Sequence, residues 1–454
     1  MNDFLIVGAG ISGLTVAWTL RRRGARVRLL EADALAGGKI RSRRRDGFLL
    51  DAGPNSLLDR GEGLGRLIDA LGLGERVVEA NTLAQRRYVV RAGRVIALPT
   101  SLMAFVRTPL FSLGAKLRLL SEPWRARAEH DESVARFVRR RLGPEFLDWA
   151  VDPFVSGVYA GDPERLSVRA ATGRIHALEA EAGSLFRGAL RRARQGRASG
   201  PVPKGRMISF REGIGELTDA LAEAMGDDLL VSRPVHALRR TDRHWVAETS
   251  QGAETGETLV LAVPSFAAAD LLDPFDGRLA AQLREIEYPG VVSLALGFAR
   301  EQVRHPLDGF GLLIPSREGC ETLGVLFSST LFPDRAPPGR VLLTAFIGGA
   351  RNPAATARDD AALIATAVDD LGPLLGLTGA PVFSEVSRWP RAIPQYTVGH
   401  LDRMANIAQG LNGLPGLQVA ANWRGGVAVG DCINNALSLA DTLLPPVSPG
   451  DGQA

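Results

Sequence analysis

The sequence predicts an α/β fold in which one parallel-sheet domain is assembled from separate parts of the chain. An apolar strand, a glycine turn, a helix and a second strand follow one another over residues 4–31. Strand-like apolar runs return at 259–263 and 416–422, whereas residues from about 100 to 195 have a helical pattern. Alternating strands and helices are typical of doubly wound sheets. We therefore expect a discontinuous α/β domain, a mixed-sheet domain and a helical insertion.

The first glycine turn has the spacing of a dinucleotide-binding motif. Gly8, Gly10 and Gly13 follow the strand Phe4–Val7 and open a helix. The first glycine allows the tight turn, the second lets backbone approach a pyrophosphate, and the third lets the helix pack closely on the strand. The helix N-terminus directs unpaired N–H groups at the phosphates. Glu31 can accept hydrogen bonds from an adenosine ribose and would repel a 2′-phosphate, so FAD or NAD is favoured over NADP.

The composition narrows the functional classes. With 454 residues, 45% of them hydrophobic, the chain is expected to form two or three domains with large cores. Cys320 and Cys432 form no pair motif and the six histidines have no metal-ligand spacing, so neither a disulfide framework nor a metal site is predicted. The net charge is +4, and the arginine clusters suit solvated faces, an anionic membrane surface or an acidic ligand. Nucleic acid is disfavoured because aromatic residues do not interleave these clusters.

The sequence indicates no transmembrane helix. The best apolar run, Phe4–Leu20, is interrupted by glycines, and Met1–Asp3 before it lacks the positive charge of a signal peptide. We expect a cytoplasmic protein, either soluble or peripheral on the inner face of the cell membrane. The 100–190 stretch mixes apolar residues and arginine, which suits a membrane interface and equally suits a plain helical core.

Local patterns predict the remaining elements. Arg87–Pro99 resembles a hairpin around an Ala-Gly turn, and helices are expected over Ser112–Trp124 and, with Asp131 as N-cap, Glu132–Leu142. Arg194–Arg206, rich in Gly, Pro and Arg, predicts an exposed linker. A large mixed sheet and a C-terminal helix are expected from Val291–Phe298, Phe310–Ile314, Leu323–Phe327, Val341–Ile347 and Asp431–Leu443.

Further motifs occur in order along nearly the whole chain. They are Gly38–Arg41, Gly53–Ser56, Ser156–Pro163, Gly309–Pro315, Trp389–Tyr396, Ala421–Asn422, Gly425–Val427 and Asp431–Ile433. Together they resemble the oxygen-dependent, FAD-containing protoporphyrinogen oxidases of the amine-oxidase-like flavoprotein class. Leu35 departs from the class, which usually has arginine there, and Ala420–Ala421 replaces the usual Ala-Gly. Backbone contacts that dominate phosphate binding survive both changes.

The resemblance implies FAD as cofactor, with a porphyrinogen and molecular oxygen as substrates. The flavin carries the chemistry, so no catalytic side chain is expected, in keeping with the lack of a nucleophile–base set in the sequence. The FAD-binding parts are expected at 1–84, 201–265 and 414–454, and the substrate-domain parts at 85–100 and 266–413. The helical domain 101–200 either associates with a membrane or forms a plain helical core. The residues expected at FAD are Gly8, Ala9, Gly10, Ile11, Ser12, Gly13, Glu31, Ala32, Gly38, Lys39, Gly53, Pro54, Asn55, Val235, Asn422, Val427 and Ile433.

The resemblance also implies a substrate pocket. Arg87 matches the family arginine that pairs with a propionate, which its planar fork suits, although a hairpin surface residue is the alternative. Glycines near the macrocycle allow close backbone approach. The other positions matching the pocket, for which ordinary core packing is the alternative, are Gly157, Gly161, Phe310, Leu313, Leu323, Leu326 and Phe346.

The implied reaction is oxidation of protoporphyrinogen IX to protoporphyrin IX in haem synthesis, with hydrogen peroxide formed. Coproporphyrinogen III, which carries two extra propionates, is the nearest alternative substrate. A flavin amine oxidase would need an aromatic cage, of which Trp423 offers one wall. A polyene desaturase, a non-enzymatic flavin-binding partner in the haem pathway and a homodimeric state stay open.

Overall fold

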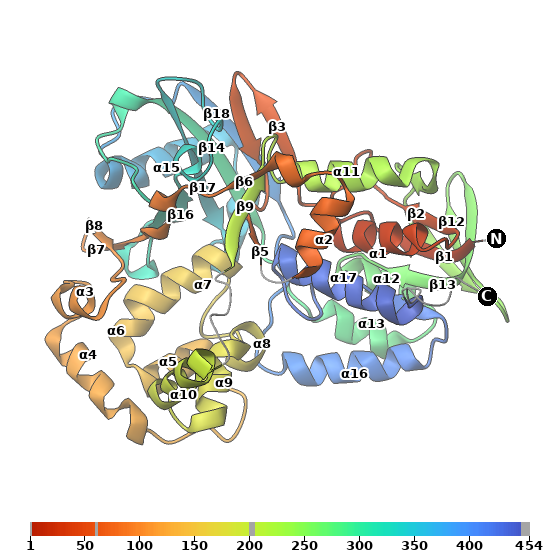
Figure 1. Ribbon diagram of the computed structural model, residues 1–454, viewed down its shortest axis with the longest axis horizontal. Helices are drawn as coiled ribbons and strands as arrows, with labels where there is room; N and C mark the ends of the chain where they lie inside the picture. Colours follow the sequence, from red (N-terminus) through yellow and green to blue (C-terminus); the bar gives the residue numbers. More distant parts are fainter. Residues whose placement is uncertain (1, 60–61, 199–204, 446–454) are drawn as a thin grey trace.

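The computed structural model describes residues 2–59, 62–198 and 205–445, and its mixed sheets and helices confirm the α/β fold class. In Figure 1 the first sheet and its helices lie on the right, the second sheet at upper left and a layer of helices at lower left. The two sheets and the helical layer together surround the cavity described below.

The first sheet has the strand order β10-β2-β1-β13-β12-β11, with β19 also paired to β13. β10, β2, β1, β13 and β19 run parallel, whereas β12 and β11 extend the sheet antiparallel. β1 and β2 are largely apolar because helices cover both faces of the sheet. The strands are β1 (Asn2–Val7), β2 (Val27–Leu30), β10 (Leu229–Leu230), β11 (Val235–Arg240), β12 (Trp245–Thr249), β13 (Gly252–Leu261) and β19 (Leu417–Val419).

Helices form separate hydrophobic cores on the two faces of this sheet. On one face lie α1 (Ile11–Arg22), α2 (Glu62–Ala70), α11 (Gly215–Met225) and α17 (Val429–Leu443), and on the other lie α12 (Ser265–Leu272), α13 (Gly277–Arg284) and α16 (His400–Asn412). The result is the three-layer arrangement expected when strands and helices alternate.

The second sheet has the order β18-β14-β17-β16-β15-β7-β8 and is covered on one face by α15 (Asp360–Leu375). β15 and β7 pair in parallel and the other neighbours are antiparallel. Its strands are β7 (Tyr88–Arg91), β8 (Arg94–Ala97), β14 (Val291–Ala299), β15 (Gly311–Leu313), β16 (Thr322–Leu326), β17 (Arg340–Gly348) and β18 (Phe383–Trp389). Two small sheets join β3 (Ser42–Arg45) to β4 (Phe48–Asp51) and β5 (Leu57–Asp59) to β9 (Arg206–Phe210) and β6 (Val77–Glu79).

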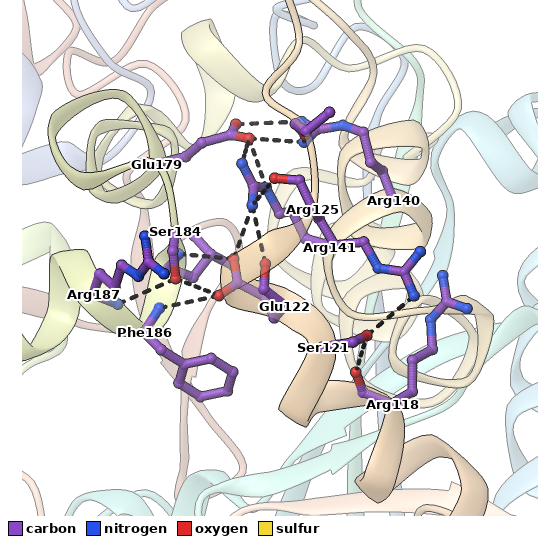
Figure 2. A network of polar contacts seen from close by, with 12 residues as sticks. Arg118, Ser121, Glu122, Arg125, Arg140, Arg141, Glu179, Ser184, Phe186 and Arg187 are labelled. Atoms are coloured by element: carbon purple, nitrogen blue, oxygen red, sulfur yellow. Dashed lines mark hydrogen bonds and ion pairs between the residues drawn. The ribbon is translucent and has the colours of Figure 1, made fainter.

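The helical layer is tied together by a buried ion cluster, which Figure 2 shows. Arg141, which is fully buried, donates from Nε to Glu179 (2.6 Å) and from a terminal nitrogen to Glu122 (3.2 Å). Glu122 also accepts from the hydroxyl of Ser184 (2.5 Å) and from the amide of Leu185 (2.9 Å), which caps the start of α10. The layer consists of α3 (Leu102–Arg107), α4 (Leu113–Arg118), α5 (Val134–Arg141), α6 (Pro144–Phe146), α7 (Asp152–Tyr159), α8 (Val168–Ala171), α9 (Gly173–Ala182) and α10 (Leu185–Ala198). Of the helices that the structure describes, none is long and apolar enough to cross a membrane.

Among the local predictions, the tight turn is confirmed, whereas a helix cap and the start of a linker are corrected. The hairpin is confirmed, because Ala92 and Gly93 adopt the positive φ angles of 52° and 68° that join β7 to β8. The N-cap prediction was wrong: Ser133, not Asp131, caps α5 by accepting from the Arg136 amide (3.2 Å). The linker prediction was wrong at its start, since α10 continues through residue 198, and residues 199–204 lie outside the described part.

Candidate functional site

One cavity of about 1760 Å³ lies where the two sheets and the helical layer meet. It is larger than the roughly 300–1,000 Å³ that accommodates an ordinary small ligand. Residues from β1, β2, α7, β16, β17 and the loop before α17 all contribute to its wall. The space is therefore large enough for an extended cofactor and a second ligand together.

Most residues predicted at the cofactor line this cavity. They are Gly8, Gly10, Ile11, Ser12, Glu31, Ala32, Gly38, Lys39, Gly53, Pro54, Asn55, Val235, Asn422 and Val427. Ala9, Gly13 and Ile433 are not among the lining residues, because Ala9 and Ile433 are fully buried in the core and Gly13 is packed against the turn. Ala9, Gly13 and Ile433 therefore support the wall from behind rather than face the space.

The glycines form a cradle that side chains would fill. Gly8 has a φ of +102°, and a Cβ on Gly13 would stand 1.9 Å from the Gly8 carbonyl oxygen, so both positions require glycine for the fold itself. A Cβ on Gly10 would meet nothing within 4 Å and would project toward the open space. Gly37 bridges to Gly10, and a Cβ on Gly38 would lie 3.3 Å from Gly10 Cα, so two glycine segments meet here. This cradle fits the pyrophosphate of a dinucleotide.

Glu31 is held at the edge of the cradle by backbone amides. Its carboxylate accepts from the Ala9 amide (2.7 Å) and the Asp33 amide (2.9 Å). A carboxylate has about four lone-pair sites, so acceptor capacity is left for the hydroxyls of a ribose. Glu31 therefore has the position and the chemistry that recognition of an adenosine ribose requires.

Lys39 brings a cation into the same end of the cavity. Burial lowers the pKa of Lys39, and no ion pair to its ammonium is found among the described residues. Its Nζ lies 5.9 Å from the centroid of the Tyr288 ring, and burial raises the pKa of Tyr288 to about 12, which keeps that phenol neutral. A cation facing an open cradle favours an anionic ligand.

Tyr396 holds the loop before α17 in place. The sequence places Tyr396 in the motif Trp389–Tyr396 but predicts no role for it. Its hydroxyl donates to the Asn422 carbonyl (2.7 Å) and accepts from the Gly426 amide (3.0 Å), while its ring lines the cavity. Trp389, also in the lining, donates its indole N–H to the Ala52 carbonyl (2.8 Å). Trp423 is fully buried and donates to the Val263 carbonyl (3.1 Å), so the expectation that it offers one wall of an aromatic cage is wrong.

An apolar wall faces the cofactor end of the cavity. Of the predicted substrate residues, those in its lining are Gly157, Phe310, Leu323, Leu326 and Phe346. Leu313 and Gly161 are not in the lining, because Leu313 turns into the core of the helical layer and Gly161 packs against Gln395 and Leu166. A Cβ on Gly157 would lie 2.4 Å from Leu313 Cδ2, so the packing of Leu313 itself requires that glycine.

Arg87 is exposed just before β7 and is not among the lining residues. Its guanidinium carbon lies 5.2 Å from the centroid of the Phe310 ring, which does line the cavity. Within residues 2–59, 62–198 and 205–445 it has no ion-pair partner, so its charge is available at the edge of the apolar wall.

The family model of flavin containing amine oxidoreductases matches residues 11–444. The chain belongs to this family. It is 36% identical, over 97% of its length and 85% of the relative, to the chloroplastic protoporphyrinogen oxidase of Nicotiana tabacum. It is 32% identical, over 97% of its length and 90% of the relative, to the coproporphyrinogen III oxidase of Propionibacterium freudenreichii.

Solved structures agree with this assignment. The "Putative protoporphyrinogen oxidase" of Exiguobacterium sp. 255-15 matches with a TM-score of 0.83 and 27% identity, covering 97% of this chain and 98% of that one. Reduced UDP-galactopyranose mutase, at 17% identity, a TM-score of 0.76 and coverage of 98% and 96%, shares the fold. The chain is an FAD-dependent oxidoreductase, and the glycine cradle, Glu31 and Lys39 suit that cofactor.

Proposed function

We propose that this flavoprotein oxidises a porphyrinogen to a porphyrin, with protoporphyrinogen IX as the preferred substrate and molecular oxygen as the final electron acceptor. The observation that carries this proposal is one continuous cavity whose lining includes both the glycine cradle and an apolar wall. Relatives named protoporphyrinogen oxidase and coproporphyrinogen III oxidase, each matched along 97% of this chain, support the same chemistry.

In this proposal the protein binds and orients the substrate and excludes water. The glycine cradle, Glu31 and Lys39 would hold FAD, which would supply two-electron oxidation; in each of three rounds the substrate would lose two electrons and two protons, one oxygen molecule would take them up, and one hydrogen peroxide would form. Phe310 and Phe346 offer apolar surface to the macrocycle, and Gly157 lets backbone approach it. Tyr396 holds the loop at Asn422 and Gly426 in place, and this loop would help to hold the cofactor beside that wall.

The test is the appearance of porphyrin fluorescence in air when the purified holoenzyme receives protoporphyrinogen IX and coproporphyrinogen III in parallel. Faster protoporphyrin formation that stops when oxygen is removed is the expected result. Faster coproporphyrin formation would support the oxidation of a porphyrinogen but make coproporphyrinogen III the preferred substrate. Rates no higher than the non-enzymatic oxidation of either compound, with FAD bound, would contradict the proposal.

We assign Arg87 the role of pairing with a carboxylate arm of the substrate. Its unpaired guanidinium stands beside Phe310, and an Arg–carboxylate pair contributes about 1.5–3 kcal/mol. Arg87→Ala should therefore raise KM roughly ten- to a hundredfold while changing kcat little. Arg94→Ala, on the second strand of the same hairpin, is the matched control, and equal KM values for the two variants would remove Arg87 from substrate binding.

We also propose that the helical layer contacts the inner face of the cell membrane, which would place the protein in the cytoplasm. Leu102 is 80% exposed and Trp124 77% exposed, with Leu113 and Leu120 also exposed nearby in the sequence. Apolar side chains near basic residues such as Lys116 suit an anionic lipid surface. Flotation with anionic liposomes should carry the protein upward, and Leu102→Glu/Leu120→Glu should abolish flotation; a wild-type protein that stays at the bottom would contradict the contact.

A further inference from the structure

Arg169 differs from the other arginines that this fold takes away from water. Arg141 and Arg335 are buried and lie beside carboxylates, those of Glu122 and Asp51 among them. Arg169 lines the cavity with its Nε buried, yet that nitrogen has no hydrogen-bond partner in the described part of the chain. Its guanidinium, which is partly exposed, also forms no ion pair there, and shielding a donor nitrogen from water without a partner is costly. A ligand that supplies oxygen acceptors would remove this cost.

The backbone places Arg169 firmly at the cavity wall. Two residues earlier, the Ser167 amide donates to the Tyr396 carbonyl (2.8 Å), and Leu166 forms a β-bridge with Thr397. α8 is thereby fastened to the segment that carries Tyr396, in the region where Figure 1 shows α8 between α9 and α16. All residues of 169–175 line the cavity.

The same stretch forms part of an opening to solvent. Arg174 is exposed at the start of α9 while it also lines the cavity, and no described residue pairs with it. Ile175, Val158 and Leu401 line the cavity and are each about half exposed, so apolar side chains rim this opening. One cation therefore lies at the rim and a second lies further inside.

We propose that Arg169, with Arg174 at the rim, forms a second oxyanion subsite that holds a carboxylate arm of the substrate. This inference rests on the proposed function. The planar guanidinium fork of Arg169 suits a carboxylate bidentately. The same fork could bind a phosphate oxygen of FAD, but the glycine cradle and Lys39 already provide for phosphate on other elements. Three acidic residues line the cavity, and none of them forms an ion pair with Arg169: they are Glu31, Asp270 and Asp431. The guanidinium is therefore free to pair with a carboxylate of the ligand.

Two cationic positions, Arg169 in the cavity wall and Arg87 at its edge, would orient a ligand that has two acidic arms. Arg87 precedes β7 of the second sheet, whereas Arg169 belongs to the helical layer. A flat macrocycle whose carboxylate arms pair with both cations can present only a limited set of edges to the cofactor. The subsite therefore selects ligands by the number and spacing of their carboxylates.

The test uses holoenzyme and the unreactive product, protoporphyrin IX, together with its dimethyl ester. Binding is followed by quenching of porphyrin fluorescence, so turnover is not needed. Arg169→Gln should weaken binding of the free acid roughly ten- to a hundredfold and leave the ester unchanged. Arg169→Lys keeps the charge but loses the planar fork. Its affinity for the free acid should therefore fall between those of wild type and Arg169→Gln. Arg340→Gln, an exposed arginine at the start of β17, is the control and should change neither affinity.

Three outcomes would overturn the subsite. Equal weakening of acid and ester would indicate a purely structural role for Arg169. An unchanged affinity for the acid, with wild type binding it well, would remove the subsite and leave the proposed function standing. A raised FAD dissociation constant, measured by flavin fluorescence, would assign the oxyanion to the cofactor instead. Failure of wild type to bind or turn over any tetrapyrrole would contradict the proposed function itself.

Discussion

His400 is a buried imidazole at the cavity wall. Its ring stacks on Tyr396 with centroids 4.0 Å apart, and its Nδ1 has no hydrogen-bond partner among the described residues. Burial, and then the nearby Arg403, lowers the pKa of His400 to about 4, although a hydrogen bond with the Trp423 backbone acts in the opposite direction. The imidazole is therefore neutral at pH 7, and protonating it would place an unpaired charge against Tyr396, which holds the loop before α17.

This histidine should make stability depend on pH. Because its folded pKa is below the ordinary 6.5, the unfolded state binds more protons between pH 6.5 and about 4, and stability is lost as the pH falls through that range. The full shift of the His400 pKa corresponds to at most about 3 kcal/mol in the free energy of unfolding. Urea unfolding at pH 7.5 and 5.0 should show a smaller loss for His400→Gln than for wild type. The exposed His130→Gln is the control, and equal losses in all three proteins would contradict the assignment.

Single residues were predictable where a local motif specifies them. Gly10 and Glu31 follow from spacing alone, because the turn, helix and strand that position them are contiguous. Arg169 and His400 have no such signal, since α8 and the Tyr396 segment that precedes His400 are distant in the sequence and meet only in the folded chain. The sequence therefore predicted more of the residues at the cofactor end of the cavity than of those on the wall that carries Arg169 and His400.

At the scale of elements, the β1–α1 turn separates two roles of glycine. A Cβ on Gly13 would collide with the Gly8 carbonyl, whereas one on Gly10 has free space within 4 Å. Gly13→Ala should reduce the free energy of unfolding of the apoprotein by about 1–3 kcal/mol or more. Gly10→Ala should keep that stability but raise the FAD dissociation constant at least about tenfold, or about 1.4 kcal/mol. Urea unfolding and flavin titration of both variants check this, and a destabilised Gly10→Ala apoprotein would contradict it.

The ion cluster of Figure 2 supports the packing of α5, α9 and α10. Glu122 is fully buried. Its removal would leave Arg141 with one carboxylate partner instead of two, and the amide of Leu185 without an acceptor. Glu122→Ala should lower the free energy of unfolding by about 3–5 kcal/mol. Glu181→Ala, which breaks the exposed pair with Arg192, should cost at most about 1 kcal/mol, and similar urea midpoints for the two variants would contradict the role of the cluster.

The run Arg139–Arg141 shows why arginine clusters are ambiguous in a sequence. Its three members contact four acids from different parts of the chain: Arg139 pairs with Glu164, Arg140 with Glu132, Arg141 with Glu122, and Arg140 and Arg141 share Glu179. None of these partners is visible as a local pattern, because they belong to other turns and helices. What resembles one basic patch in the sequence is three separate contacts in the fold.

At the scale of the whole molecule, a buried ion pair between Asp51 and Arg335 connects the two parts that contain the large sheets. Asp51 of β4 accepts from Ser42 Oγ (2.6 Å) and from the Ile214 amide (3.0 Å), and it lies 3.6 Å from the Arg335 guanidinium. Arg335 precedes β17 and donates to Ser209 Oγ (2.7 Å) of β9. Burial raises the pKa of Asp51 and lowers the pKa of Arg335, so each charge depends on the other.

Breaking this pair should therefore weaken the connection between the parts. Asp51→Asn or Arg335→Met alone leaves one buried charge unpaired and should reduce the free energy of unfolding by about 3–5 kcal/mol. The double variant buries no lone charge, so its loss should be smaller than the sum of the single losses. Arg165→Gln, which breaks a half-exposed pair with Glu287, is the control and should cost at most about 1 kcal/mol. Urea unfolding of all four variants measures these differences, and strictly additive losses at Asp51 and Arg335 would show that the two charges act independently.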